Sequence, residues 1–168
     1  MVRLTMRQEI HCDVASFWQH FFDPELSRRL FIEGLEFIAY STVRQVETAT
    51  TIERTVAVEP KVTIPAPIAK AFGSSFRYSE EGVFDKSSQV RKWRMISGTL
   101  PDKIRVTGTL RCVPLDATKV ARDVEIDIEA KVMLLGGMIE EAFKKQLRAG
   151  WEHSADVQNR WLREAAGS

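Results

Sequence analysis

The chain has 168 residues, of which 44% are hydrophobic and 28% are charged, a balance typical of one folded domain with an ordinary polar surface. A formal net charge of +1 excludes the strong global field that recruits nucleic acid or an acidic membrane. No run is apolar and long enough for a transmembrane segment or a signal peptide. We therefore expect residues 1–168 to form a single cytoplasmic domain with no nucleic-acid partner.

The cysteines and histidines do not show metal-ligand spacing. Cys12 and Cys112 are far apart in the sequence, and the three histidines form no HExxH or similar cluster. The sequence therefore predicts two free thiols, no metal site and no cofactor.

The chain begins with a strand followed by two short helices. Apolar and polar residues alternate over residues 2–11, as in a half-buried strand. Asp13 and Asp23 are suited to capping two successive helices, Pro24 fits the first position of the second helix, and Gly34 is expected to end it.

Six more strands are predicted to pair as three hairpins, over residues 35–46 with 50–60, 75–84 with 89–97, and 103–113 with 119–132. Opposite charges suggest the registers, with Arg44 facing Glu53 in the first hairpin and Arg105 facing Asp127 in the third. The inner faces of the first two hairpins are then Phe37, Ala39, Val43, Ile52, Val56 and Val58, and Phe76, Tyr78, Glu80, Phe84, Arg91, Trp93 and Met95.

A stripe of alternating acidic residues runs along the last strand: Asp123, Glu125, Asp127 and Glu129. We interpret it as a solvated sheet face, because carboxylates at strand spacing fan out rather than converge on one ion.

An apolar segment, KVTIPAPIAKAFG over residues 61–73, separates the first two hairpins. Its prolines break any strand, and Ile68–Phe72 can form one helical turn that ends at Gly73. Two interpretations stay open: the segment packs on the core, or it is a mobile lid that touches a membrane transiently.

The longest periodic segment, residues 137–162, predicts an amphipathic helix. Its apolar stripe contains Ile139, Phe143, Leu147, Val157 and Trp161. Gly150 lies within this stripe, where a glycine costs about 1 kcal/mol relative to alanine. Either a strand approaches closely there, or space is left for another molecule.

The order of elements indicates an α+β fold in which a strongly bent antiparallel sheet of seven strands wraps around the long C-terminal helix. The stretches DVASFWQHFFDPE, PDKIRVTGTLRCVPLD and GGMIEEAFKKQLRAGWEHSADVQNRWL carry a resemblance to the helix-grip fold. This is the fold of the START-like, or Bet v1-like (SRPBCC), superfamily, and the last stretch resembles its uncharacterised bacterial members. The resemblance covers essentially the whole chain and implies a hydrophobic cavity between sheet and helix that binds lipids, sterols or polyketides.

We therefore predict that the protein binds or transfers a hydrophobic, lipid-like small molecule. The expected ligand-binding residues are Arg54, Phe76, Tyr78, Glu80, Trp93, Met95, Phe143, Gln146, Leu147, Gly150 and His153. Arg91 and Arg122 are expected to extend toward water from strand ends, and Glu80 to pair with Arg54 or Arg91 if buried.

Two alternatives remain. The first is a polyketide cyclase or dehydratase that uses Glu80, Tyr78 or His153 for proton transfer and Arg54 to hold an oxyanion. The second is a co-chaperone or regulatory domain whose surface binds a protein.

Overall fold

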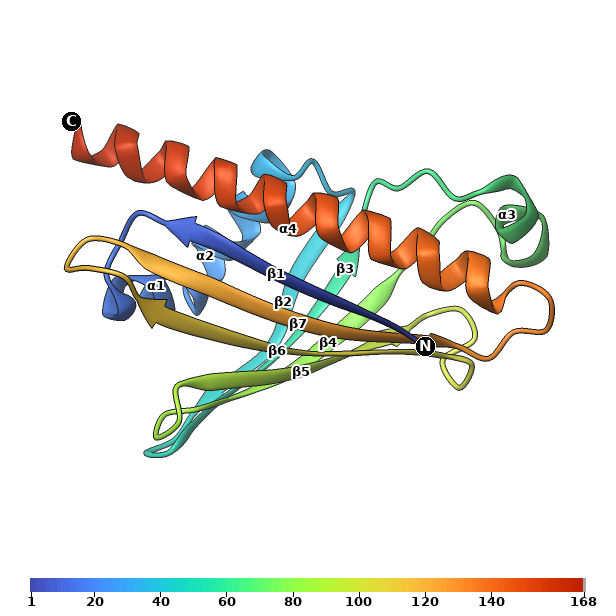
Figure 1. The fold of residues 1–168 in the computed structure, drawn as a ribbon, viewed down its shortest axis with the longest axis horizontal. Helices are drawn as coiled ribbons and strands as arrows, with labels where there is room; N and C mark the ends of the chain where they lie inside the picture. Colours follow the sequence, from blue (N-terminus) through green and yellow to red (C-terminus); the bar gives the residue numbers. More distant parts are fainter. Residues whose placement is uncertain (168) are drawn as a thin grey trace.

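A seven-stranded antiparallel sheet with one long helix across it forms the molecule in the computed structural model, which describes residues 1–167 (Figure 1). The strands are β1 (Val2–Ile10), β2 (Ala39–Glu47), β3 (Thr51–Glu59), β4 (Tyr78–Asp85), β5 (Val90–Ser97), β6 (Ile104–Pro114) and β7 (Val120–Ala130). The helices are α1 (Val14–Phe21), α2 (Pro24–Arg29), the π-helical turn η1 (Leu30–Gly34), α3 (Ala66–Phe72) and α4 (Gly136–Ala166). The strand order β1-β7-β6-β5-β4-β3-β2 and the two short helices after β1 confirm the predicted fold class.

Side-chain caps fix the two short helices at one end of the sheet. Asp13 accepts a hydrogen bond from the Ser16 backbone N–H at 2.8 Å, and Asp23 accepts one from Glu25 N–H at 2.9 Å. The chain does not stop being helical at Arg29 but continues as η1 to Gly34. Gly34 permits η1 to lie against α4, because a Cβ there would be 2.8 Å from Cγ1 of Val157.

The first hairpin differs from the prediction. Glu47 pairs with Ile52, and a β-bulge between Thr42 and Arg44 shifts the register. The bulge turns Val43 outward, where it is 63% exposed, and the predicted inward position of Ala39 is also wrong. Tyr40 is buried instead, opposite Val58. Arg44 still reaches Glu53 diagonally, at 3.2 Å.

The third hairpin has the predicted faces but a different register. Val113 pairs with Ala121 and Arg105 with Glu129, a shift of two residues along β7. The acidic residues of β7 recur at every second position, so a two-residue shift preserves an opposite-charge pair and leaves every side chain on its face. Charge pairing therefore could not distinguish the two registers.

The acidic stripe on β7 forms ion pairs with arginines of β1. Arg3 donates to Asp127 at 2.7 Å, and Arg7 donates to Asp123 at 2.6 Å. Both pairs lie on the exposed face of the sheet, as predicted for a solvated stripe.

Helix α4 crosses the concave side of the sheet and lies closest to β1 and β7 (Figure 1). Near its start, the buried Glu140 accepts a hydrogen bond from the Ala130 backbone N–H at 3.0 Å, which ties the helix to the end of β7. Ile139 and Val157 are buried, whereas Phe143, Leu147 and Trp161 remain half-buried. None of the helices within residues 1–167 is both long and apolar enough to span a bilayer.

Candidate functional site

Two adjoining cavities lie between the sheet and α4. The first, which we call the α1 cavity, has a volume of about 590 Å³ and is enclosed by β3–β5, by α1 to η1 and by the C-terminal half of α4. The second, the α3 cavity, has a volume of about 400 Å³ and lies under the N-terminal half of α4, against residues 60–76. Both volumes fall in the range of small-molecule sites. The residues common to both walls are Leu35, Phe37, Tyr78, Met95, Gln146, Leu147 and Gly150.

Gly150 is the point of α4 where the two cavities meet. A Cβ built on this residue would find nothing within 4 Å, so no strand approaches it. Of the two interpretations offered by the sequence, the structure supports open space. Ser154, one turn later, is buried and lines the α1 cavity, which continues from Gly150 toward the C-terminal end of α4.

The structure places every sequence-predicted ligand residue on these walls. Arg54, Glu80 and Trp93 line the α1 cavity, whereas Phe76, Phe143 and His153 line the α3 cavity. The other five, Tyr78, Met95, Gln146, Leu147 and Gly150, line both. Gln146 and His153 are exposed along the edge of α4. For all eleven residues, contact with a ligand stays a prediction.

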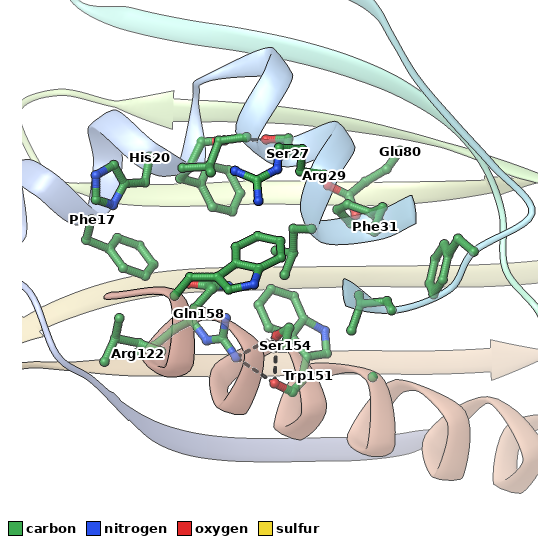
Figure 2. A pocket seen from close by; sticks show the side chains of 18 of the residues that line it. Phe17, His20, Ser27, Arg29, Phe31, Glu80, Arg122, Trp151, Ser154 and Gln158 are labelled. Atoms are coloured by element: carbon green, nitrogen blue, oxygen red, sulfur yellow. Dashed lines mark hydrogen bonds between the residues drawn. The ribbon is translucent and has the colours of Figure 1, made fainter. Parts of the chain in front are cut away.

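Sequence reasoning missed the wall that the short helices provide. Phe17, Phe21, Leu30 and Phe31 cover the α1 cavity from α1 and η1, and Trp151 covers it from α4. Figure 2 shows Phe17 and Phe31 on the helices across the cavity from Trp151. The apolar face of the first short helix was a usable signal, because it must lie on the inner side of a bent sheet.

A buried ion pair crosses the floor of the α1 cavity. Arg91 donates from Nη2 to Oε1 of Glu80 at 2.7 Å, and the Arg91 side chain is 1% exposed against 18% for Glu80. Arg91 therefore does not extend to water, contrary to the sequence-based expectation. Gly82 makes this position possible, since a Cβ there would be 2.1 Å from Nη2 of Arg91.

Arg54 is buried beside this pair but does not pair with Glu80. Its Nη1 donates to the Phe21 carbonyl and, at 3.2 Å, to Oγ of Ser27. Its guanidinium carbon also lies 4.4 Å from the centre of the Phe21 ring, at cation–π distance. Burial lowers the pKa of Arg54 from its ordinary value.

Arg122 is the third buried arginine, and it too was expected to reach water. Its guanidinium donates to the Gln8 side chain at 3.1 Å. It also donates to the Trp151 carbonyl at 2.7 Å and to Oγ of Ser154 at 3.0 Å (Figure 2). Desolvation by burial lowers its pKa. These contacts link β7 to the middle of α4, so Arg122 fixes the position of this helix relative to the sheet.

Burial raises the pKa of three other groups near the cavities. The Tyr78 hydroxyl has its pKa raised by desolvation and then by the Glu80 charge, so the hydroxyl stays protonated at neutral pH. The two free thiols show the same effect of burial, with the pKa of Cys12 raised to about 11 and that of Cys112 to about 12.

The segment 61–73 covers the α3 cavity. Ile68 and Phe72 of α3 pack against the hydrophobic core, and Ile64 and Pro65 also line the cavity. The predicted helical turn is present as α3, and Gly73 follows it with a left-handed φ of 93°. Packing on the core is therefore observed, while movement of this segment stays a prediction.

Solved structures share this architecture over nearly the whole chain. The Zhui aromatase/cyclase from Streptomyces sp. R1128 superposes with a TM-score of 0.71 at 12% identity, over 98% of this chain and 97% of that one. A START superfamily protein from Mycobacterium smegmatis gives 0.61 at 12% identity, over 97% and 98%. Norcoclaurine synthase from Thalictrum flavum, in complex with dopamine and hydroxybenzaldehyde, gives 0.63 at 16% identity, over 97% and 87%. Together with the cavities under α4, these likenesses define the chain as a protein of the START-like fold.

Residues 5–162 match the model of the family described as a protein of unknown function, DUF2505, and the chain belongs to that family. No curated protein matches the chain. Identities of 12% and 16% to the solved structures establish a common fold and leave function to the site itself.

Proposed function

We propose that this protein binds a hydrophobic small molecule in the two cavities and carries it without chemical change. The observation that supports this most is the open space at Gly150, a helix residue that lines both cavities. A glycine at this position costs the helix stability, and space for a ligand accounts for that cost.

Native mass spectrometry of the purified protein tests this proposal. The wild type should carry an added mass that is lost on denaturation, either a co-purified ligand or an added apolar probe such as 1-dodecanol. Gly150→Trp should reduce the bound fraction, because an indole would fill the junction of the cavities. Gly137→Trp is the matched control, since Gly137 lies on the same helix, is exposed and lines neither cavity. A wild type that stays empty with the probe in excess would contradict the proposal.

The segment 61–73 is our candidate for the gate of the α3 cavity. It contributes Ile64, Pro65, Ile68 and Phe72 to the wall, and it carries Lys61 and Lys70, which suit a transient contact with an acidic membrane surface. Replacing Lys61 and Lys70 by glutamine should slow ligand transfer from anionic vesicles and leave transfer from neutral vesicles unchanged. Equal slowing with both vesicle types would remove the electrostatic role.

A cyclase-type enzyme is the second candidate. Tyr78 and Glu80 line the same cavity wall, and two structurally similar proteins are an aromatase/cyclase and a synthase. Arg91 already donates a hydrogen bond to the Glu80 carboxylate, so a substrate would have to compete with Arg91 for this carboxylate. His153 is exposed and lines only the α3 cavity, whereas Glu80 lines only the α1 cavity, so the two side chains do not share a cavity. Turnover of a polyketide-like substrate that is lost in Glu80→Gln with folding intact would favour this candidate.

We also propose a cytoplasmic location, which the two free thiols support, because such thiols persist in a reducing compartment.

A further inference from the structure

The α1 cavity contains more buried positive than negative charge. Arg54, Arg91 and Arg122 are 5%, 1% and 2% exposed. Among the described residues that line this cavity, the carboxylates are Glu80 on β4 and Glu164, which is exposed near the end of α4. Glu80 is engaged by Arg91, and Arg122 is satisfied by neutral acceptors. Arg54 is therefore left with a buried charge and no carboxylate partner among the described residues.

Hydrogen-bond donors on this wall also lack acceptors. Nε of Arg54, Nε of Arg91 and Nε1 of Trp93 are buried and have no hydrogen-bond partner within residues 1–167. A buried donor without an acceptor costs free energy, and a buried cation without a counter-charge costs more. All three donors belong to residues that line the α1 cavity, and a bound molecule with hydrogen-bond acceptors would satisfy them.

The two guanidinium groups with unpartnered donors both lie beside the ring of Phe21. Their central carbons are 4.4 Å and 5.1 Å from the centre of the same Phe21 ring, for Arg54 and Arg91 respectively. The charge of Arg91 also contributes to lowering the pKa of Arg54, after the larger effect of burial. One oxyanion held by both arginines would relieve their mutual repulsion and supply acceptors to both.

We propose that the ligand is an amphipathic anion, whose oxyanion is held by Arg54 and Arg91 at the α1 end and whose apolar body runs past Gly150 toward the α3 cavity. This inference rests on the proposed binding function and adds the chemical class of the ligand to it. A long-chain carboxylate and an aromatic carboxylate share this chemistry, and the experiment below distinguishes them.

Pairs of probes that differ only in charge test the proposal. Dodecanoic acid with 1-dodecanol represents the aliphatic case, and 2-naphthoic acid with 2-naphthalenemethanol represents the aromatic case, all measured by titration calorimetry near neutral pH. In one of the two pairs, the acid should bind the wild type roughly 10- to 100-fold more tightly than the alcohol, from the usual strength of hydrogen bonds to charged groups. The pair that shows this preference identifies the kind of apolar body.

Substitutions assign the preference to the arginines. Arg54→Gln should abolish the preference for the acid over the alcohol, whereas Arg54→Lys should retain part of it. Arg111→Gln is the matched control, because Arg111 is exposed on β6 outside both cavities. If Arg54→Gln does not fold, the comparison of acid with alcohol on the wild type still decides the question.

The failures of the two proposals are distinguishable. Equal affinities of acid and alcohol for the wild type would overturn the anionic ligand and leave hydrophobic binding intact. A preference for the acid that persists undiminished in Arg54→Gln would also overturn it. If neither acids nor alcohols bind, both the binding function and this inference are wrong.

Discussion

Neutralising Glu80 should destabilise the protein by removing the counter-charge of a buried arginine. The Arg91 side chain is 1% exposed, and within residues 1–167 its one carboxylate contact is with Glu80, at 2.7 Å. Removing one member of a buried ion pair typically costs roughly 3–5 kcal/mol. In Glu80→Gln the amide oxygen can still accept a hydrogen bond from Arg91, and the Glu80 side chain is 18% exposed. We therefore expect the free energy of unfolding to fall by about 2 kcal/mol, which is below that range.

Thermal unfolding followed by circular dichroism measures this cost. For a chain of 168 residues, about 2 kcal/mol corresponds to a decrease in Tm of about 4–8 °C. The neighbouring Glu81 supplies the control, because its pair with Arg94 on the outer face is 41% and 64% exposed. Glu81→Gln should cost at most about 1 kcal/mol. An acidic probe that binds Arg91 should restore part of the Tm of Glu80→Gln.

The result that refutes this reasoning is a Glu80→Gln variant no less stable than Glu81→Gln. The Phe21 ring and water in the cavity would then be sufficient to hold the Arg91 charge.

Three further predictions concern packing, acid and thiol reactivity. Gly108→Ala should lower the free energy of unfolding by about 1–3 kcal/mol and alter tryptophan fluorescence, because a Cβ at this position would be 2.4 Å from the Trp93 ring. Unchanged fluorescence would contradict this placement of Trp93. The hydrogen bond from Ala130 N–H lowers the pKa of Glu140, so its stabilisation is complete above the ordinary carboxyl pKa and is lost as the pH falls through the lowered value. Glu140→Gln should thus lower the Tm at neutral pH, and by less as the pH falls below the ordinary carboxyl pKa, whereas the exposed Glu141→Gln should change the Tm at neither pH. A Tm deficit of Glu140→Gln that is undiminished in acid would show a packing effect. Because burial raises the pKa of Cys12 to about 11 and that of Cys112 to about 12, both thiols should react with iodoacetamide much more slowly in the folded protein than in urea, and equal rates would show that they are accessible.

The elements with local signals could be predicted from the sequence. The alternation over β1, the capping aspartates Asp13 and Asp23, and the periodic stripe of α4 each determine a structure within a few residues. The cavity-facing positions on β4, β5 and α4 followed from the same periodicities, since alternate strand residues share a face.

The features that depend on long-range geometry could not be predicted. The β7 register was wrong by two residues because its charges repeat with the period of the strand itself. The bulge near Val43 contains no glycine that would indicate it in the sequence. Because of the extra residue, the side chains of β2 that face the core differ from those predicted. The burial of Arg91 depends on the space above Gly82 in the neighbouring strand, which becomes visible only when β4 and β5 are paired.

The four tryptophans allow the most direct test of the central claim, that a hydrophobic ligand occupies the space under α4. Trp93, Trp151 and Trp161 line the α1 cavity, whereas Trp18 is buried outside its wall. In protein labelled with ¹⁵N at the indole nitrogens, titration with an apolar ligand should shift the Trp93 and Trp151 signals most and the Trp18 signal least. Shifts confined to Trp18, or no shifts at saturating ligand, would contradict the account.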